Sequence, residues 1–258
     1  MNNIKSILIP TDFSNVSQMA LEYAANLVQS DHTVHVTLLH ILNEDISPEK
    51  AERQLKDLRA TYQELIPALE CQVTHGGLID SVLEGQRTYK ANLIIMGTKG
   101  STEEESVAMT LTSELVTEAN CPVLVIPPRK QEFRVRNIAL ALGTDDMDSS
   151  LALGVLFDIA RAFDAKVHIL SVLKEGEEPR LNERNQSILE YYFQTLDYHH
   201  AFPHNSDIEE GISSYVKQND INLLAIMPRN HATKSTPSEG RLTKLLTMHA
   251  QVPLLTID

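Results

Sequence analysis

Apolar and polar positions follow two different periods along the first half of the chain. Short continuous apolar runs, such as residues 7–9 and 93–96, are typical of strands buried on both faces of a parallel sheet. Between such runs, apolar residues recur at helical spacing, as in Ala51, Leu55, Leu58, Tyr62 and Leu65. The pattern predicts five strands alternating with four helices, and therefore a doubly wound α/β sheet with parallel strands.

Residues 92–127 contain a complete strand, loop, helix and strand. The apolar run 93–96 leads into Gly97, and Gly100 follows in the loop. A ligand site forms in an open parallel sheet beyond the carboxyl end of such a strand. Glycines there let backbone amides approach an anion, and the next helix directs its positive end toward it. That helix has its predicted apolar face at Val107, Leu111, Leu115, Val116 and Ala119.

The same pattern restarts after a polar connector led by two prolines. The apolar runs at residues 138–142, 167–170, 222–227 and 252–255 repeat those at 7–9, 34–37, 92–96 and 121–124. The period is about 130 residues, which indicates tandem domains rather than a solenoid of short repeats. We expect one domain at residues 1–128 and a second at 135–258, joined by a linker at 129–134.

Composition excludes several classes of partner. The net charge of −13 argues against nucleic acid, because phosphate binding requires a basic face. No apolar run approaches the ~20 residues of a membrane span, and the amino end enters a strand without a basic leader, so we expect a cytoplasmic protein without membrane contact. Cys71 and Cys121 each precede an apolar segment, and we expect both to be buried free thiols.

Motifs for common enzyme chemistries are missing from the sequence. There is no GxxxxGK[ST], GxSxG, HExxH or GxGxxG segment, and no CxxC pair. A set of acid, base and nucleophile cannot be assembled from residue spacing. We therefore expect a protein that is not an enzyme.

Several segments together resemble the universal stress protein family. They are ILIPTDFS, IIMGTKG and ANCPVLVIP in the first half, and AIMPRNH and HAQVPLLTI in the second. The chain is similar to tandem two-domain members over essentially its full length. The resemblance implies two flavodoxin-like five-stranded parallel sheets of order 3-2-1-4-5, a role in stress survival or regulation and, in one subset of the family, ATP binding.

The resemblance also implies an arrangement of the two domains. The last strand of each domain, residues 123–126 and 254–257, is an apolar edge without charge, and native proteins cover or pair such edges. Single-domain relatives pair this strand across a two-fold axis. We therefore expect the two edges to pair antiparallel about a pseudo-two-fold axis. The sequence identifies no protein partner and leaves homodimerisation open.

The nucleotide motif of the ATP-binding subset is only partly present. That motif is G-x-x-G, nine residues, then Gly and Ser or Thr. Gly97 and Gly100 fit, but Thr110 or, with the register shifted by one, Met109 stands where the next glycine should be, and Glu103–Glu105 follow Gly100 closely in the sequence. By resemblance, a nucleotide in the first domain would contact Asp12, Ile41, Gly97, Gly100 and Thr110. We expect a non-enzymatic regulatory protein with a degraded loop; the alternative is an ATP-binding switch, and a slow nucleotide hydrolase is a third.

Other polar residues have competing interpretations. Asp12 in Thr-Asp-Phe-Ser equally fits a helix-entry residue. Arg229 and Arg241 lie in a basic segment that would bind an anion or be solvated.

Neighbouring side chains of a strand point to opposite faces, so His199 and His200 should not share a metal. A zinc site between His40 and His75 stays open, whereas Glu103–Glu105 fit a solvated loop better than a metal site. We expect no metal.

Overall fold

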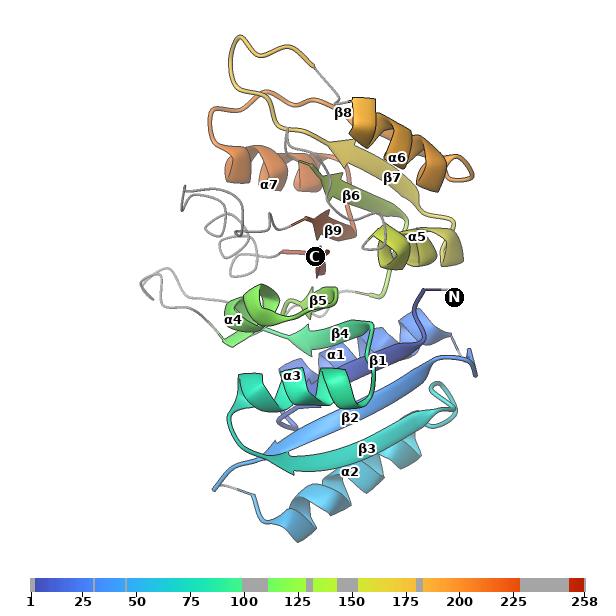
Figure 1. The fold of residues 1–258 in the computed structure, drawn as a ribbon, viewed down its shortest axis with the longest axis vertical. Helices are drawn as coiled ribbons and strands as arrows, with labels where there is room; N and C mark the ends of the chain where they lie inside the picture. The colour runs from blue at the N-terminus through green and yellow to red at the C-terminus, as the bar shows by residue number, and fades with distance from the viewer. Residues whose placement is uncertain are drawn as a thin grey trace. The chain divides into compact units, whose positions relative to one another are not determined.

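The computed structural model describes residues 3–29, 31–44, 46–98, 111–128, 132–142, 153–179, 183–227 and 251–257 of the chain. The chain divides into two compact units (Figure 1). Unit 1 comprises residues 1–133 and 247–251, and unit 2 comprises residues 134–246 and 252–258.

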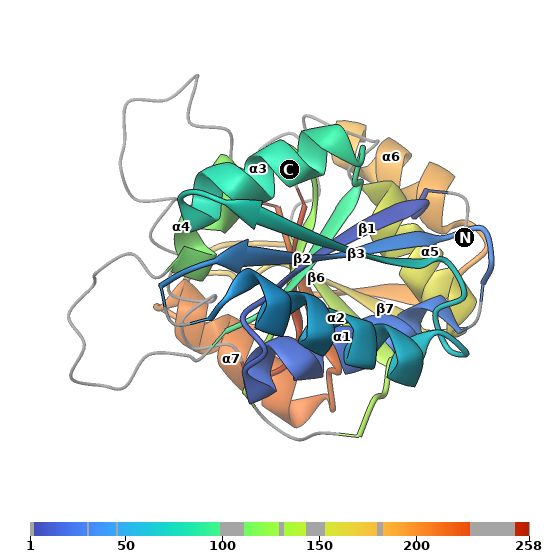
Figure 2. The ribbon, with the colours of Figure 1, turned by 90° about the horizontal axis from the view of Figure 1, so that it is seen from below.

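Unit 1 alternates strands and helices as the hydrophobic pattern predicts. Its described elements are β1 (Ser6–Thr11), α1 (Asn15–Val28), β2 (His35–Leu42), α2 (Pro48–Tyr62), β3 (Leu69–His75), α3 (Leu78–Thr88), β4 (Leu93–Gly97), α4 (Leu111–Glu118) and β5 (Val123–Ile126). The strands are parallel and lie in the order β3-β2-β1-β4-β5. Helices α1 and α2 cover one face of this sheet, and α3 and α4 cover the other (Figure 2). The predicted order 3-2-1-4-5 is confirmed.

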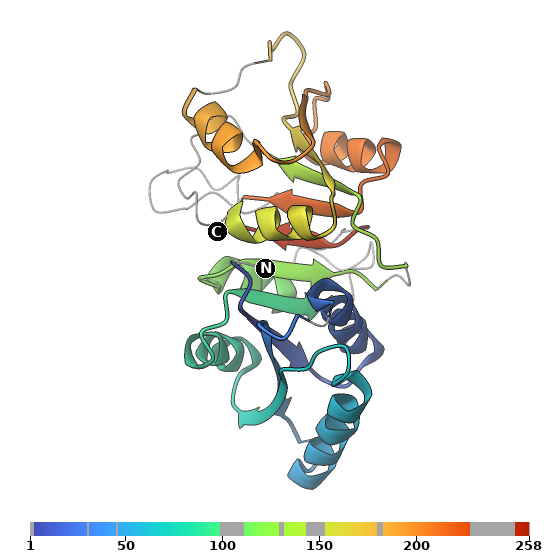
Figure 3. The ribbon, with the colours of Figure 1, turned by 90° about the vertical axis from the view of Figure 1, so that its right-hand side faces the viewer.

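Unit 2 has the same topology. Its described elements are β6 (Asn137–Ala141), α5 (Leu153–Ala162), β7 (Lys166–Leu170), α6 (Glu183–Phe193), β8 (Tyr198–Ala201), α7 (Ile208–Gln218), β9 (Leu223–Ile226) and β10 (Leu254–Thr256). These strands are also parallel, in the order β8-β7-β6-β9-β10. Helices α5 and α6 lie on one face and α7 on the other (Figure 3).

The strand pairings fix which residues of the two units correspond. Ser6 pairs with His35 in unit 1, and Asn137 pairs with Lys166 in unit 2. Ile7 pairs with Leu93, and Ile138 pairs with Leu223. Counting from these pairs, Thr37 and Glu70 in unit 1 correspond to His168 and His199 in unit 2, and Gly97 corresponds to Met227.

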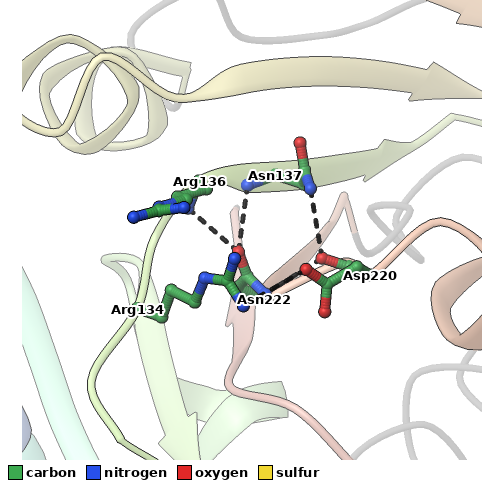
Figure 4. Close-up of polar contacts among 5 residues, drawn as sticks. All are labelled: Arg134, Arg136, Asn137, Asp220 and Asn222. Carbon is green, nitrogen blue, oxygen red and sulfur yellow. Dashed lines mark hydrogen bonds and ion pairs between the residues drawn. The ribbon is translucent and has the colours of Figure 1, made fainter.

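An asparagine joins two strands in the same way in both units. The Oδ1 atom of Asn222 accepts hydrogen bonds from the backbone N–H groups of Arg136 (3.0 Å) and Asn137 (3.1 Å), as Figure 4 shows. The Oδ1 atom of Asn92 accepts from the corresponding groups, the N–H of Lys5 (3.2 Å) and of Ser6 (3.1 Å). We call these two contacts the asparagine clamps. Their repetition supports the predicted duplication.

Two predicted core positions are wrong. Leu65 is 50% exposed because α2 ends at Tyr62, so the helical period stops before it and Ile66 is buried instead. Leu111 is 54% exposed because it is the first residue of α4, one turn before the buried Leu115. Val107 lies outside the described residues. The residue limits of the predicted domains and linker, and the pseudo-two-fold arrangement, stay predictions.

Candidate functional site

The carboxyl ends of three neighbouring strands define a candidate site in unit 1. β2, β1 and β4 lie side by side, and Thr11 at the end of β1 pairs with His40 of β2. Asp12 follows β1, Ile41 lies near the end of β2, and Gly97 ends β4. The structure thus brings three of the five predicted nucleotide-binding positions to one edge of the sheet. Gly100, Thr110, Arg229 and Arg241 lie outside the described residues.

Asp12 is an exposed side chain that organises the start of α1. Its Oδ1 atom accepts a hydrogen bond from the N–H of Ser14 at 3.0 Å. Ser14 is the N-cap of α1, and its hydroxyl accepts from the N–H of Ser17 at 3.3 Å. Burial raises the pKa of Asp12, but hydrogen bonds from Ser14 and Ser17 outweigh it, so this pKa lies below its ordinary value. The carboxylate is therefore ionised at neutral pH and already serves a local structural purpose.

A buried histidine supports the turn beside Asp12. His40 is 1% exposed, and its Nδ1 atom lies 2.8 Å from the carbonyl oxygen of Thr11. The ring of Phe13 packs on the His40 ring with centroids 4.4 Å apart. Phe13 has a φ of 62°, a left-handed conformation unusual for an aromatic residue, and this packing offsets its cost.

His40 and His75 differ in environment. His40 is buried beneath the turn, whereas His75 is exposed. Within the described residues, no group of three or more histidine, cysteine, aspartate or glutamate side chains is arranged to hold a metal ion. The described structure therefore offers no ligand set for the zinc site that the sequence leaves open.

Gly97 is required by the packing of α1. A Cβ atom on Gly97 would lie 2.4 Å from the carbonyl oxygen of Val16 and 2.5 Å from its Cγ1 atom. Contacts this short do not occur between real atoms, and the carbonyl belongs to the backbone of α1, which cannot turn aside. The first turn of α1 thus occupies the space that the missing side chain leaves. This close approach is not evident from the sequence, where Gly97 reads as part of a phosphate loop.

Neither cysteine is activated. Both are free thiols; Cys121 is buried, but Cys71 is only half-buried, so the predicted burial holds for one of them. Burial raises the pKa of Cys121 to about 12. It also raises the pKa of Cys71, whose thiol lies 3.5 Å from the carbonyl oxygen of Leu55. Both thiols are therefore protonated at neutral pH, which disfavours nucleophilic chemistry.

The histidines of unit 2 are arranged differently from those of unit 1. His199 packs against His168 of β7, while His200 packs with Tyr198 and Phe202. His199 and His200 thus have different partners, as expected for neighbouring residues of a strand, whose side chains point to opposite faces of the sheet. His168 belongs to this group only because β7 pairs with β8 and so brings it beside His199, a contact that residue spacing in the sequence does not indicate.

Comparisons with known proteins agree with this architecture. Residues 3–127 match the model of the universal stress protein family. A universal stress protein of Methanocaldococcus jannaschii is 28% identical over 150 residues, a match that covers 51% of this chain and 86% of that protein. A universal stress protein of Synechocystis is 27% identical over 135 residues, covering 48% of this chain and 85% of that protein.

A solved structure extends the similarity of fold to both units. The crystal structure of a universal stress protein from Archaeoglobus fulgidus matches with a TM-score of 0.72 and 16% identity, covering 98% of each chain. The family match covers residues 3–127, just under half of the chain, and the similarity of unit 2 to universal stress proteins is one of fold alone. No helix within the described ranges is long and apolar enough to cross a membrane.

Proposed function

We propose that this chain is a non-enzymatic stress-response and regulatory protein that acts by binding other molecules, with a degraded nucleotide loop in unit 1. The proposal rests on the close packing of Gly97 against the first turn of α1. The space beside it is filled by the backbone carbonyl of Val16, which a Cβ would meet at 2.4 Å. Packing thus accounts for this glycine without a phosphate.

Asp12 supports the same interpretation. Its carboxylate accepts the N–H of Ser14 and so helps the chain to enter α1. A helix-entry aspartate is stabilised by exposed N–H groups and by the positive end of the helix, and needs no ligand. The fold of unit 1 therefore accounts for both Asp12 and Gly97 without a bound nucleotide.

The residues that follow Gly100 in the sequence oppose phosphate binding. Glu103–Glu105 place three carboxylates within five residues of Gly100 in the sequence. A carboxylate about 5 Å from a phosphate repels it by roughly 3 kcal/mol at an effective dielectric constant near 20. Lys99 offsets one such charge, and Thr110 adds a Cβ where the family motif has glycine. Both features weaken an ATP site.

The second candidate function is an ATP-binding switch in unit 1. It is favoured by the exposed, ionised Asp12 and by the gathering of Asp12, Ile41 and Gly97 at the carboxyl ends of adjacent parallel strands. Ligands of open α/β sheets bind at this edge. The switch requires that the backbone amides after Gly97 outweigh the three glutamates.

Titration calorimetry separates the two candidates. The full chain is first analysed for co-purified nucleotide and then titrated with ATP and magnesium. We expect no binding at millimolar ATP. Micromolar, magnesium-dependent binding that is lost in Asp12→Ala and in Gly100→Val would establish the switch instead. Glu118→Ala is the matched control, because Glu118 is an exposed carboxylate in the last turn of α4, which precedes the amino end of β5 rather than following the carboxyl end of a strand.

A further inference from the structure

Unit 2 contains a cluster of two histidines and a tyrosine that unit 1 lacks. His168 lies within β7 and is 6% exposed, and its register partner on β8 is His199. Their ring centroids are 4.3 Å apart, with ring planes at 63°. The Nδ1 atom of His168 lies 2.9 Å from the hydroxyl oxygen of Tyr215 on α7. One helix and two strands therefore meet at these three side chains, which we call the histidine latch.

Two nitrogen atoms of the latch lack a hydrogen-bond partner. The Nε2 atom of His168 and the Nδ1 atom of His199 are buried and have no partner among the described residues. Neutral rings packed edge to face tolerate this arrangement. A protonated ring does not, because a buried cation needs an acceptor for each N–H group. The geometry therefore favours the uncharged form of the pair.

The charged groups around His168 act in the same direction. Burial, the largest cause, acts together with His199 and Lys166 to lower the pKa of His168 to about 4, and Asp197 opposes them. Lys166 is on β7 itself and lies 3.8 Å from Asp197, which precedes β8. Tyr215 faces the ring from α7, and β6 presents Ala139, which does not titrate. The described surroundings thus supply no carboxylate within hydrogen-bonding distance of His168.

The latch lies where the sheet of unit 2 is most easily opened. β8 is the edge strand of this sheet, spans only Tyr198–Ala201 and pairs with β7. A short edge strand held on one side depends heavily on its cross-strand side-chain contacts. The His168–His199 contact is one of these, so a charge placed there acts directly on the attachment of β8.

We propose that the histidine latch is an acid-operated device that holds β8 on the sheet while both imidazoles are neutral and releases this edge when His168 takes up a proton. The released ring is solvated and binds a proton with ordinary histidine affinity, so protons favour the released state. The attachment of β8 is therefore constant above pH 6.5 and weakens as the pH falls from 6.5 toward 4.

Hydrogen exchange of the intact protein at pH 7.5 and pH 5.0 tests the device. Protection factors, corrected for the intrinsic exchange rate at each pH, are compared between Tyr198–Ala201 and the strand Leu93–Gly97 of unit 1, which contains no histidine. We expect protection of β8 to fall about tenfold at the lower pH, with β4 unchanged. Unchanged protection of β8, or an equal fall in both units, would overturn the proposal.

A double variant isolates the titrating ring. His168→Phe combined with Tyr215→Phe keeps two aromatic rings, removes the imidazole and leaves no unpaired tyrosine hydroxyl. We expect β8 to keep its protection at pH 5.0 in this variant, whereas His35→Gln, which removes an exposed histidine of unit 1, should behave like the parent. Persistence of the pH effect in the double variant would contradict the latch.

NMR of the unaltered protein tests the proposal even if the double variant does not fold. The imidazole resonances of the ten histidines are followed by NMR from pH 8 to pH 4.5. We expect His168 to stay neutral until well below pH 6 and to protonate together with the loss of β8 protection. Protonation of His168 near pH 6.5 without loss of that protection would show that the ring is merely buried.

Discussion

Units 1 and 2 have the same strand order in their sheets but carry different side chains on them. The strand order is the same in both, and the asparagine clamps at Asn92 and Asn222 make the same pair of backbone contacts. At the carboxyl ends, however, Gly97 of unit 1 corresponds to Met227 of unit 2. On the paired strands, Thr37 and Glu70 of unit 1 correspond to His168 and His199 of unit 2.

The comparison separates what both copies of the fold retain, which is backbone hydrogen bonding, from what differs between them, which is the side chains on the sheet. The clamps supply an acceptor for backbone N–H groups at the start of the first strand of each unit, and those of Ser6 and Asn137 are partly buried and need one. Side chains at the carboxyl ends and within the strands carry no such requirement and differ between the units. Unit 1 has an acid at Asp12, where the sequence of unit 2 has Gly143 or Thr144, and unit 2 carries a histidine latch within β7 and β8 that unit 1 lacks.

The largest effect should come from adding a side chain at Gly97. In Gly97→Ala, the new Cβ meets the Val16 carbonyl at 2.4 Å, and the backbone of α1 must shift. We expect the free energy of unfolding of unit 1 to fall by about 3 kcal/mol, measured by chemical denaturation. In the matched control Gly77→Ala, the Cβ meets only the flexible carboxylate of Asp80 at 3.3 Å, and the loss should stay below about 1 kcal/mol. Equal losses would show that Gly97 is not held by packing.

Removing either clamp should have an intermediate and symmetric effect. Asn92→Ala and Asn222→Ala each leave two backbone N–H groups without their acceptor. We expect each to lower the free energy of unfolding of its unit by about 1–2 kcal/mol, measured by hydrogen exchange within that unit. Asn26→Ala is the control, because Asn26 is an exposed asparagine of α1 whose side chain only donates to its own helix. A large loss in one unit alone would break the equivalence of the two clamps.

The smallest effect concerns the charge of Asp12. Because the pKa of Asp12 lies below its ordinary value of 3.8 in the folded protein, the ionised form stabilises unit 1 above that pH. This stability is lost as the pH falls through the folded pKa. We expect Asp12→Asn to remove a few tenths of a kcal/mol at pH 7 and nothing at pH 2. Denaturation at both pH values checks this, and a difference that grows toward pH 2 would reverse the sign and refute it.

Much of the fold could be predicted from the sequence because burial on both faces produces continuous apolar runs. Strands β1, β4 and β5 show this pattern directly, and it predicts their parallel pairing. Leu65 was misplaced because periodicity does not show where a helix ends; the chain leaves α2 at Tyr62, and Ile66 becomes the buried residue.

The candidate site was less predictable because its interactions are between segments distant in sequence. Asp12 could be assigned to a helix entry from Thr-Asp-Phe-Ser alone, since its partner Ser14 is two residues away. The contact of Gly97 with Val16 joins β4 to α1, and that of His168 with His199 depends on strand register. Such contacts appear only when the chain is folded.

Amide NMR with added ATP and magnesium tests most directly the claim that the site of unit 1 is structural. The full chain is titrated to millimolar ATP while the amides of Asp12, Ile41 and Gly97 are followed, with Asn137–Ala141 of unit 2 as the internal reference. The account predicts that the three amides of unit 1 shift no more than those of the reference strand. Saturable shifts at Asp12, Ile41 and Gly97 that disappear in Asp12→Ala would contradict it and establish a nucleotide site.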